Sequence, residues 1–235
     1  IGSVLMRSAG CIFNDIVDKD FDKKVKRTRL RPIASGIISV KQAFVYVVIL
    51  CALALIVLVQ FNSLTILIGM SSMLLAFSYP FMKRITYWPQ LFLGITFNWG
   101  ILMASTAMNN GISGEIIILY ISAIFWTLGY DTIYGAQDMS DDEIIGLKST
   151  SIKFKNNIKL FVSTCYLVSI FLLIYLFHSF FGKNLPTLFF ILANLTLIYQ
   201  LIYFDKSNSI SCLRLFKLNN LTGLLIFLSI FSINF

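Results

Sequence analysis

The sequence predicts an all-α fold, a polytopic bundle of transmembrane helices, on three observations. Hydrophobic residues make up 57% of the 235 residues. Charged residues make up only 13%, which is about half the share of roughly 25% in a soluble domain. The apolar residues form long runs that do not alternate with polar ones, as the strands of a membrane β-barrel would. This composition argues against a water-soluble fold and excludes a disordered chain.

The predicted helices follow one another along the whole chain. Residues 1–18 have the pattern of a helix whose beginning is cut off. Each later run approaches the roughly 20 apolar residues that a bilayer-spanning helix needs. The seven complete spans are 42–60, 64–81, 90–107, 116–134, 160–178, 187–204 and 218–235. Because the chain begins with Ile inside an apolar stretch, we expect one membrane domain, residues 1–235, that lacks an N-terminal piece.

The basic residues agree with this order of helices. One set of connections holds 16 of the 19 Lys and Arg residues, whereas the opposite set holds only Lys183. The first set comprises 23–41, 82–89, 135–159 and 205–217, and the second 61–63, 108–115 and 179–186. Since Lys and Arg collect in cytoplasmic loops, we expect the first set to face the cytoplasm of a bacterial inner membrane, with a mitochondrial inner membrane as the alternative. The bias explains most of the net charge of +8 without a nucleic-acid partner.

Nine of the eleven acidic residues fall in two short windows on that same predicted side. In the first window, a turn of about 100° per residue places Asp15, Asp18 and Asp22 on one helix face with Asn14. Crowded carboxylates repel one another and are costly in a membrane, and a divalent cation relieves both costs. Oxygen-only ligands favour Mg²⁺ over zinc, and protein-bound Mg²⁺ commonly also takes substrate phosphates.

The second window follows the same arithmetic. Asp131, Asp138 and Asp142 lie within about 20° of one line if the helix continues past Gly135. Two carboxylate stripes facing each other across a cavity mouth can hold a pair of Mg²⁺ ions with a diphosphate between them. Such an arrangement neutralises the charge that develops on a leaving diphosphate.

Basic residues near the two windows suit the oxygens of a diphosphate, although the charge bias of the loops accounts for most of them. Arg27, Arg29 and Arg31 follow the first window and Lys148 follows the second, and Arg7 lies two turns earlier on the helix face of the first window. Tyr79 and Lys83 are four residues apart and therefore share a helix face. Arg84, beside them, has the two-pronged guanidinium that binds a carboxylate.

These motifs together resemble the UbiA superfamily of intramembrane prenyltransferases, from about residue 5 to the C-terminus. The first aspartate-rich motif is matched by Asn14-Asp15-x-x-Asp18-x-x-x-Asp22, the second by Asp138-x-x-x-Asp142, and a third signature by Tyr79-x-x-x-Lys83. Further segments resemble the members that prenylate 4-hydroxybenzoate. These are Lys26-Arg27-Thr28, Arg31-Pro32, Tyr79-Pro80-Phe81-Met82-Lys83-Arg84, Tyr130-Asp131-Thr132 and Ile145-Gly146-x-Lys148-Ser149-Thr150.

The resemblance implies a fold of nine transmembrane helices around a central cavity, of which about eight are represented here. It implies an Mg²⁺-dependent enzyme in the lipid bilayer, acting in ubiquinone biosynthesis. The substrates would be a polyprenyl diphosphate and 4-hydroxybenzoate, and the prenyl group would go to the ring carbon next to the hydroxyl.

Residue roles are carried over from the matching motifs. The implied metal ligands are Asn14, Asp15, Asp18, Asp22, Asp138 and Asp142. The implied diphosphate ligands are Arg7, Arg27, Arg31 and Lys148. The implied catalytic residues are Tyr79, Lys83, Arg84, Asp131 and Asp138, with Arg84 on the substrate carboxylate and Asp131 or Asp138 as the base. The aromatic faces of Tyr79 and Tyr134 would stabilise an allylic cation.

Two alternatives stay open at the level of the sequence. The first is another superfamily member, acting in the menaquinone, homogentisate or haem pathway. The second is a cation transporter that uses intramembrane carboxylates. Transporter sites usually lie near the middle of the membrane, whereas these acids cluster at one predicted membrane face.

Overall fold

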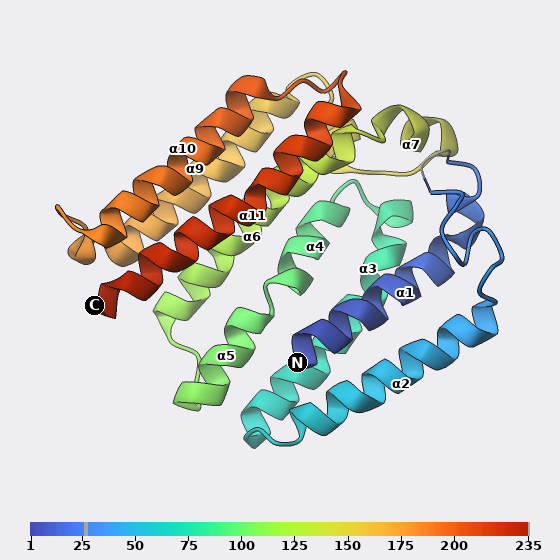
Figure 1. Cartoon of the computed structure of the whole chain (residues 1–235), viewed down its shortest axis with the longest axis horizontal. Helices are drawn as coiled ribbons and strands as arrows, with labels where there is room; N and C mark the ends of the chain where they lie inside the picture. Colours follow the sequence, from blue (N-terminus) through green and yellow to red (C-terminus); the bar gives the residue numbers. More distant parts are fainter. Residues whose placement is uncertain (26–27, 235) are drawn as a thin grey trace. The chain divides into compact units, whose positions relative to one another are not determined.

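The computed structural model describes residues 1–25 and 28–234, and within them it contains helices and turns but no strand. It divides into two compact units. Unit 1 comprises Ile1–Ile85 and Ile95–Ile116, and unit 2 comprises Thr86–Gly94 and the chain from Ile117 onward. Figure 1 shows the helices of both units.

Eleven α-helices make up most of the described chain. The helices are α1 (Gly2–Asp22), α2 (Val40–Leu58), α3 (Ser63–Ile85), α4 (Pro89–Phe97), α5 (Gly100–Asn109), α6 (Gly114–Ala136), α7 (Met139–Ile145), α8 (Thr150–Lys153), α9 (Ile158–Phe177), α10 (Leu185–Tyr203) and α11 (Ser209–Phe231). Among the described residues, seven segments are long and apolar enough to cross a membrane, with α4 and α5 together forming one of them. The predicted all-α membrane fold is confirmed: the chain is an integral membrane protein.

The outer surface of α2 shows how such a helix meets lipid. Phe44, Val45, Val48 and Ile49 are all about half exposed or more. An apolar surface of this kind is unfavourable in water and suits the hydrocarbon core of a bilayer. The helix begins at a capping box, in which Ser39 and Gln42 satisfy each other's backbone N–H groups.

The span predicted at 90–107 is interrupted in the structure. α4 ends at Phe97 and α5 begins at Gly100. Between them the Trp99 backbone N–H bonds to the Thr96 carbonyl, three residues back, in a tightened turn. In unit 1 the Trp99 indole donates to the Ile68 carbonyl at 2.9 Å. This hydrogen bond holds the break in place, and Gly100, a weak helix former, follows it directly.

The last membrane span begins earlier in the sequence than predicted. α11 starts at Ser209 rather than at residue 218. Its cap is the Asn208 side chain, which accepts a hydrogen bond from the Ser211 N–H at 3.0 Å. Arg214 and Lys217, assigned to a loop from the sequence, therefore lie on the exposed side of α11.

Unit 1 is built on α1, which packs along α2 and contacts α3. The described part of the segment between α1 and α2 forms a series of turns, and its Val25, Ile33 and Ala34 side chains are buried. Arg31 of this segment and Lys83 at the end of α3 both contact aspartates in the last turns of α1. The segment is therefore a packed part of the unit, and it lies beside the aspartates of α1.

Unit 2 contains α6, α9, α10 and α11, which lie side by side (Figure 1). Their interior holds a buried polar network. The Tyr166 hydroxyl donates to Gln200 Oε1 at 2.7 Å, and the amides of Gln200 and Asn219 bond to each other at 3.1 and 3.3 Å. The Trp126 indole donates to Asn219 Oδ1 at 3.0 Å. One network thus joins all four helices.

Candidate active site

The last turns of α1 present the first aspartate motif. Asp18 and Asp22 are buried, Asp15 is half-buried and Asp20 is exposed. The predicted helix face is therefore confirmed. Negative charge near a helix C-terminus opposes the helix dipole. These carboxylates do not stabilise α1 by themselves, so their partners have to come from elsewhere in unit 1.

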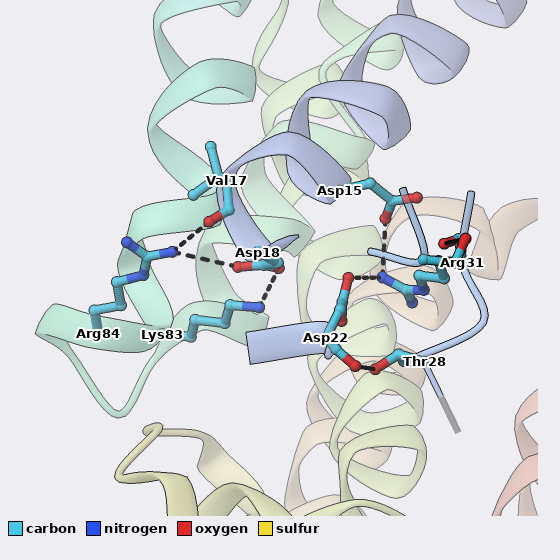
Figure 2. Close-up of polar contacts among 9 residues, drawn as sticks. Asp15, Val17, Asp18, Asp22, Thr28, Arg31, Lys83 and Arg84 are labelled. Carbon is cyan, nitrogen blue, oxygen red and sulfur yellow. Dashed lines mark hydrogen bonds and ion pairs between the residues drawn. The ribbon is translucent and has the colours of Figure 1, made fainter. Parts of the chain in front are cut away.

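Arg31 supplies one such partner from the segment after α1. Its Nη1 atom lies 2.9 Å from Asp15 Oδ1 and 3.0 Å from Asp22 Oδ2, so one nitrogen bridges two carboxylates (Figure 2). Thr28 helps to place the segment, because its hydroxyl donates to the Asp22 backbone carbonyl at 3.1 Å. The Arg31 backbone is held as well, since its carbonyl accepts from the Ser35 N–H at 2.8 Å.

The end of α3 supplies the other partners. The Lys83 ammonium donates to Asp18 Oδ2, and Arg84 Nη2 lies 3.6 Å from Asp18 Oδ1 (Figure 2). Arg84 also donates to the Val17 carbonyl at 2.7 Å and lies over the Phe21 ring at 4.8 Å. Its guanidinium, predicted to bind a substrate carboxylate, thus contacts the end of α1.

Other predicted residues of unit 1 lie outside this group of ion pairs. Arg7 is exposed, with its guanidinium 5.3 Å from the centre of the Phe97 ring. Asn14 and Tyr79 are half-buried, Tyr79 one turn before Lys83 on α3. Arg27 lies outside the described residues.

The donor atoms of the first motif suit Mg²⁺, but they are not arranged as a ready-made metal site. Among the described residues, no three His, Cys, Asp or Glu side chains converge on one point. Arg31 and Lys83 pair with these carboxylates instead. Asp18 Oδ1, however, is buried and accepts no hydrogen bond within the described part of the chain. A buried carboxylate oxygen without a hydrogen bond is the kind of ligand that a hard divalent cation takes.

In unit 2, Asp131, Asp138 and Asp142 do not lie along one helix face, so that prediction is wrong. α6 carries Asp131 and ends at Ala136, so the three residues do not share a helix. Asp138 leaves the helical conformation at the N-cap position of α7, where its backbone carbonyl, and not its side chain, accepts from the Asp142 N–H at 2.9 Å. The break follows from the acids themselves, because Asp141 and Asp142 are favoured in the first turn of a new helix.

Lys148 follows α7 and is held near α6 by its neighbours. The hydroxyls of Thr132 and Thr150 lie 2.7 Å apart, and Ser151 donates to the Thr132 carbonyl at 2.8 Å. Lys148 itself lies 5.6 Å from the centre of the Tyr87 ring. The two segments that suggested a 4-hydroxybenzoate enzyme, around Asp131 and around Lys148, are thus bonded to each other.

Gln90 completes this attachment, and the sequence analysis missed it. Its Oε1 atom accepts from the Thr150 N–H at 2.9 Å, and the residue is buried. A Cβ atom at Gly135 would lie 2.7 Å from Ser151 Oγ and 3.1 Å from Gln90 Nε2, so glycine is needed for this close approach. A polar residue at the start of an apolar span was the signal that could have identified Gln90.

The chain is similar to known proteins over nearly its whole length. The model of the UbiA prenyltransferase family matches residues 1–227. The chain belongs to the UbiA prenyltransferase family. The rat protein named "4-hydroxybenzoate polyprenyltransferase, mitochondrial" (Rattus norvegicus) is 44% identical over 231 residues. That match covers 97% of this chain, but the chain spans only 62% of the length of the rat relative.

Solved structures of UbiA homologues have the same fold. The apo UbiA homologue from Aeropyrum pernix K1 matches with a TM-score of 0.82 at 25% identity, over 97% of this chain and 86% of that one. A UbiA homologue from Archaeoglobus fulgidus, solved with DMAPP and Mg²⁺, matches with a TM-score of 0.66 at 19% identity, over 99% and 87%. The UbiA fold of this chain is thereby established.

Proposed function

We propose that this chain transfers a polyprenyl group from polyprenyl diphosphate to 4-hydroxybenzoate, at the ring carbon next to the hydroxyl, in ubiquinone biosynthesis. The observation that carries the proposal is the 44% identity to the rat 4-hydroxybenzoate polyprenyltransferase across 97% of the chain. The bonded pair of Thr132 and Thr150 supports it, because both residues belong to the segments that resemble this group of enzymes. Membership of a prenyltransferase family also favours a transferase over a cation transporter.

The cofactor in this proposal is Mg²⁺, as in the Archaeoglobus fulgidus homologue solved with DMAPP and Mg²⁺. When bound, Mg²⁺ neutralises the charge that develops on a leaving diphosphate. The residues assigned to hold it are Asn14, Asp15, Asp18, Asp22, Asp138 and Asp142. The buried Asp18 Oδ1 atom, which accepts no hydrogen bond from the described residues, supports this assignment.

Four basic residues, Arg7, Arg27, Arg31 and Lys148, are assigned to the diphosphate oxygens. Arg31 already lies at the first motif, and a guanidinium binds phosphate as readily as carboxylate. Arg7, Arg27 and Lys148 are assigned the same role from the motifs alone. These residues orient the diphosphate so that its bond to the prenyl carbon can break.

The transfer of the prenyl group needs three functions from the protein: to shield the allylic cation, to remove the ring proton and to bind the carboxylate of the acceptor. The carbon–oxygen bond of the prenyl diphosphate breaks, and the electron pair leaves with the diphosphate. The aromatic faces of Tyr79 and Tyr134 shield the allylic cation from water. The ring carbon then forms the new carbon–carbon bond, and Asp131 or Asp138 removes the ring proton. Arg84 is assigned to the carboxylate of 4-hydroxybenzoate.

The membrane of residence is part of the proposal. The rat relative is named as mitochondrial. This name favours a mitochondrial inner membrane over a bacterial inner membrane for this chain. The positive-inside rule describes Lys and Arg collecting in the loops on one side of a membrane. In either membrane, the connections rich in Lys and Arg, 135–159 among them, are proposed to lie on that side.

A comparison of three aromatic acceptors tests the proposed function. The chain in lipid nanodiscs receives one prenyl diphosphate with Mg²⁺ and, separately, 4-hydroxybenzoate, 1,4-dihydroxy-2-naphthoate or homogentisate. Mass spectrometry is expected to detect a prenylated product with 4-hydroxybenzoate alone. Turnover of naphthoate or homogentisate without turnover of 4-hydroxybenzoate would contradict the proposal.

A further inference from the structure

Counted over the described residues, the first aspartate motif is electrically balanced by cations of unit 1. Asp15, Asp18 and Asp22 carry three negative charges. Arg31, Lys83 and Arg84 meet them with three positive charges, at distances of 3.6 Å or less. A divalent cation that approaches this balanced cluster alone therefore meets little net attraction.

The two cations that pair most closely have side chains able to change partner. The Arg31 side chain is 33% exposed and that of Lys83 is 27% exposed, whereas the Asp18 side chain is only 2% exposed. The Arg31 backbone is fixed on both sides, since its N–H bonds to Thr28 and its carbonyl accepts from Ser35. The guanidinium can therefore move while the segment that carries it stays in place.

We infer that Arg31 and Lys83 are exchangeable counter-ions that couple the binding of metal and diphosphate. Without diphosphate they neutralise the aspartates and keep the affinity for Mg²⁺ low. When the prenyl diphosphate of the proposed function arrives, they transfer to its oxygens and leave the carboxylates to the metal. Each ligand then raises the affinity for the other by the same factor, as linkage requires, which typically lies at about 5–150-fold.

The exchange predicts effects of opposite sign from one substitution. In Arg31→Gln, Asp15 and Asp22 lose their competing cation, so Mg²⁺ alone should bind more tightly than to the wild type. The same change removes a ligand of the diphosphate, so the diphosphate should bind less tightly. A merely structural role for Arg31 would weaken both.

Calorimetry on the full chain in lipid nanodiscs measures both affinities. One titration uses Mg²⁺ alone, and the other adds an unreactive prenyl thiolodiphosphate at saturating Mg²⁺. For Arg31→Gln we expect Mg²⁺ to bind at least about 5-fold more tightly and the analogue at least about 5-fold more weakly, following the lower limit of typical coupling. Lys41→Gln is the control, because Lys41 is exposed at the start of α2 and no ion pair joins it to a described carboxylate. Its two affinities should stay at the wild-type values.

Each outcome decides the inference. If Arg31→Gln binds Mg²⁺ no more tightly than the wild type, the exchange is wrong. If Arg31→Gln does not fold, Lys83→Gln, which frees Asp18, must give the same opposite pair of changes, and loss of fold in both means that these cations are structural. The proposed function is scored separately by the acceptor assay. Coupling without prenylation of 4-hydroxybenzoate overturns only that function, and prenylation without coupling overturns only the exchange.

Discussion

Lys83 pairs with Asp18 across 65 positions of sequence, and the aspartate in this pair is almost completely buried. Together with Arg84, which lies 3.6 Å from the same carboxylate, Lys83 joins α3 to α1 by contacts between opposite charges. A buried ion pair adds little net stability compared with apolar packing, but loss of one partner is costly because the other charge stays buried. This asymmetry gives a first prediction.

Lys83→Gln should destabilise the chain, because it leaves the Asp18 carboxylate without its closest cation. Breaking a buried pair costs about 3–5 kcal/mol, and we expect the lower end because Arg84 Nη2 remains 3.6 Å away. Thermal unfolding in detergent micelles, followed by tryptophan fluorescence, measures the loss. Lys41→Gln on the exposed start of α2 should change stability by less than about 0.5 kcal/mol. Equal unfolding temperatures for the two variants would show that the Lys83–Asp18 pair does not stabilise the fold.

Asp18→Asn should remove nearly all Mg²⁺-dependent product formation while the protein still inserts into membranes. Loss of a residue that only supports a metal ligand costs about 10–100-fold in affinity or activity, and loss of a ligand should cost at least as much. Asp20→Asn, on the exposed side of the same helix, should keep wild-type activity. A chelator should stop the wild-type reaction, and added Mg²⁺ should restore it. Normal turnover by Asp18→Asn would refute the metal assignment.

Gln90→Leu should weaken the binding of prenyl diphosphate more than it slows the chemical step. The Thr150 N–H loses its acceptor, which costs about 1–3 kcal/mol for a buried group, and the segment after Lys148 loses an anchor. Steady-state kinetics should therefore show a raised KM for prenyl diphosphate with a smaller change in kcat. Gln60→Leu, exposed at the end of α2, is the control. An unchanged KM in folded Gln90→Leu would exclude a positioning role.

Gly129→Ala should destabilise unit 2, because the added Cβ atom would lie 2.5 Å from Cε1 of the buried Tyr166 ring. Overpacking of this kind typically costs about 1–3 kcal/mol. Gly10→Ala on α1 meets no atom within 4 Å and should be neutral or slightly stabilising, since alanine is the better helix former. Comparison of the two unfolding temperatures tests the contact, and a Gly129→Ala variant as stable as Gly10→Ala would contradict it.

Helix periodicity was sufficient to predict which side of α1 is buried. The spacing of Asp15, Asp18 and Asp22 fixes their common face, and the structure buries that face while Asp20 stays exposed. The runs of apolar residues predicted the seven spans for the same local reason, since each depends on residues close in sequence.

The partners of the aspartates could not be predicted in this way. Seven basic residues lie between 23 and 41, and all suit a cytoplasmic loop equally well. The turns after α1 select Arg31 for Asp15 and Asp22, and the packing of α3 against α1 brings Lys83 to Asp18. Both depend on contacts between residues that are distant in sequence.

The end of α6 was missed for a different reason. Periodicity alone continues a helix through Gly135 and on to Asp142. The actual end at Ala136 reflects a competition, in which a new first turn with two acids, Asp141 and Asp142, prevails over one continued helix. Such competition between local signals is not visible in the helical periodicity.

The paired amides of Gln200 and Asn219 have a consequence for how the polypeptide assembles in the bilayer. Interhelical hydrogen bonds in membranes average only about 0.6 kcal/mol each, so these contribute little to the total stability. They do distinguish one alignment of α10 and α11 from its neighbours. A shift by one turn would separate Gln200 from Asn219 and break both hydrogen bonds between their amides inside the bundle. The pair therefore selects the vertical register of this helical hairpin.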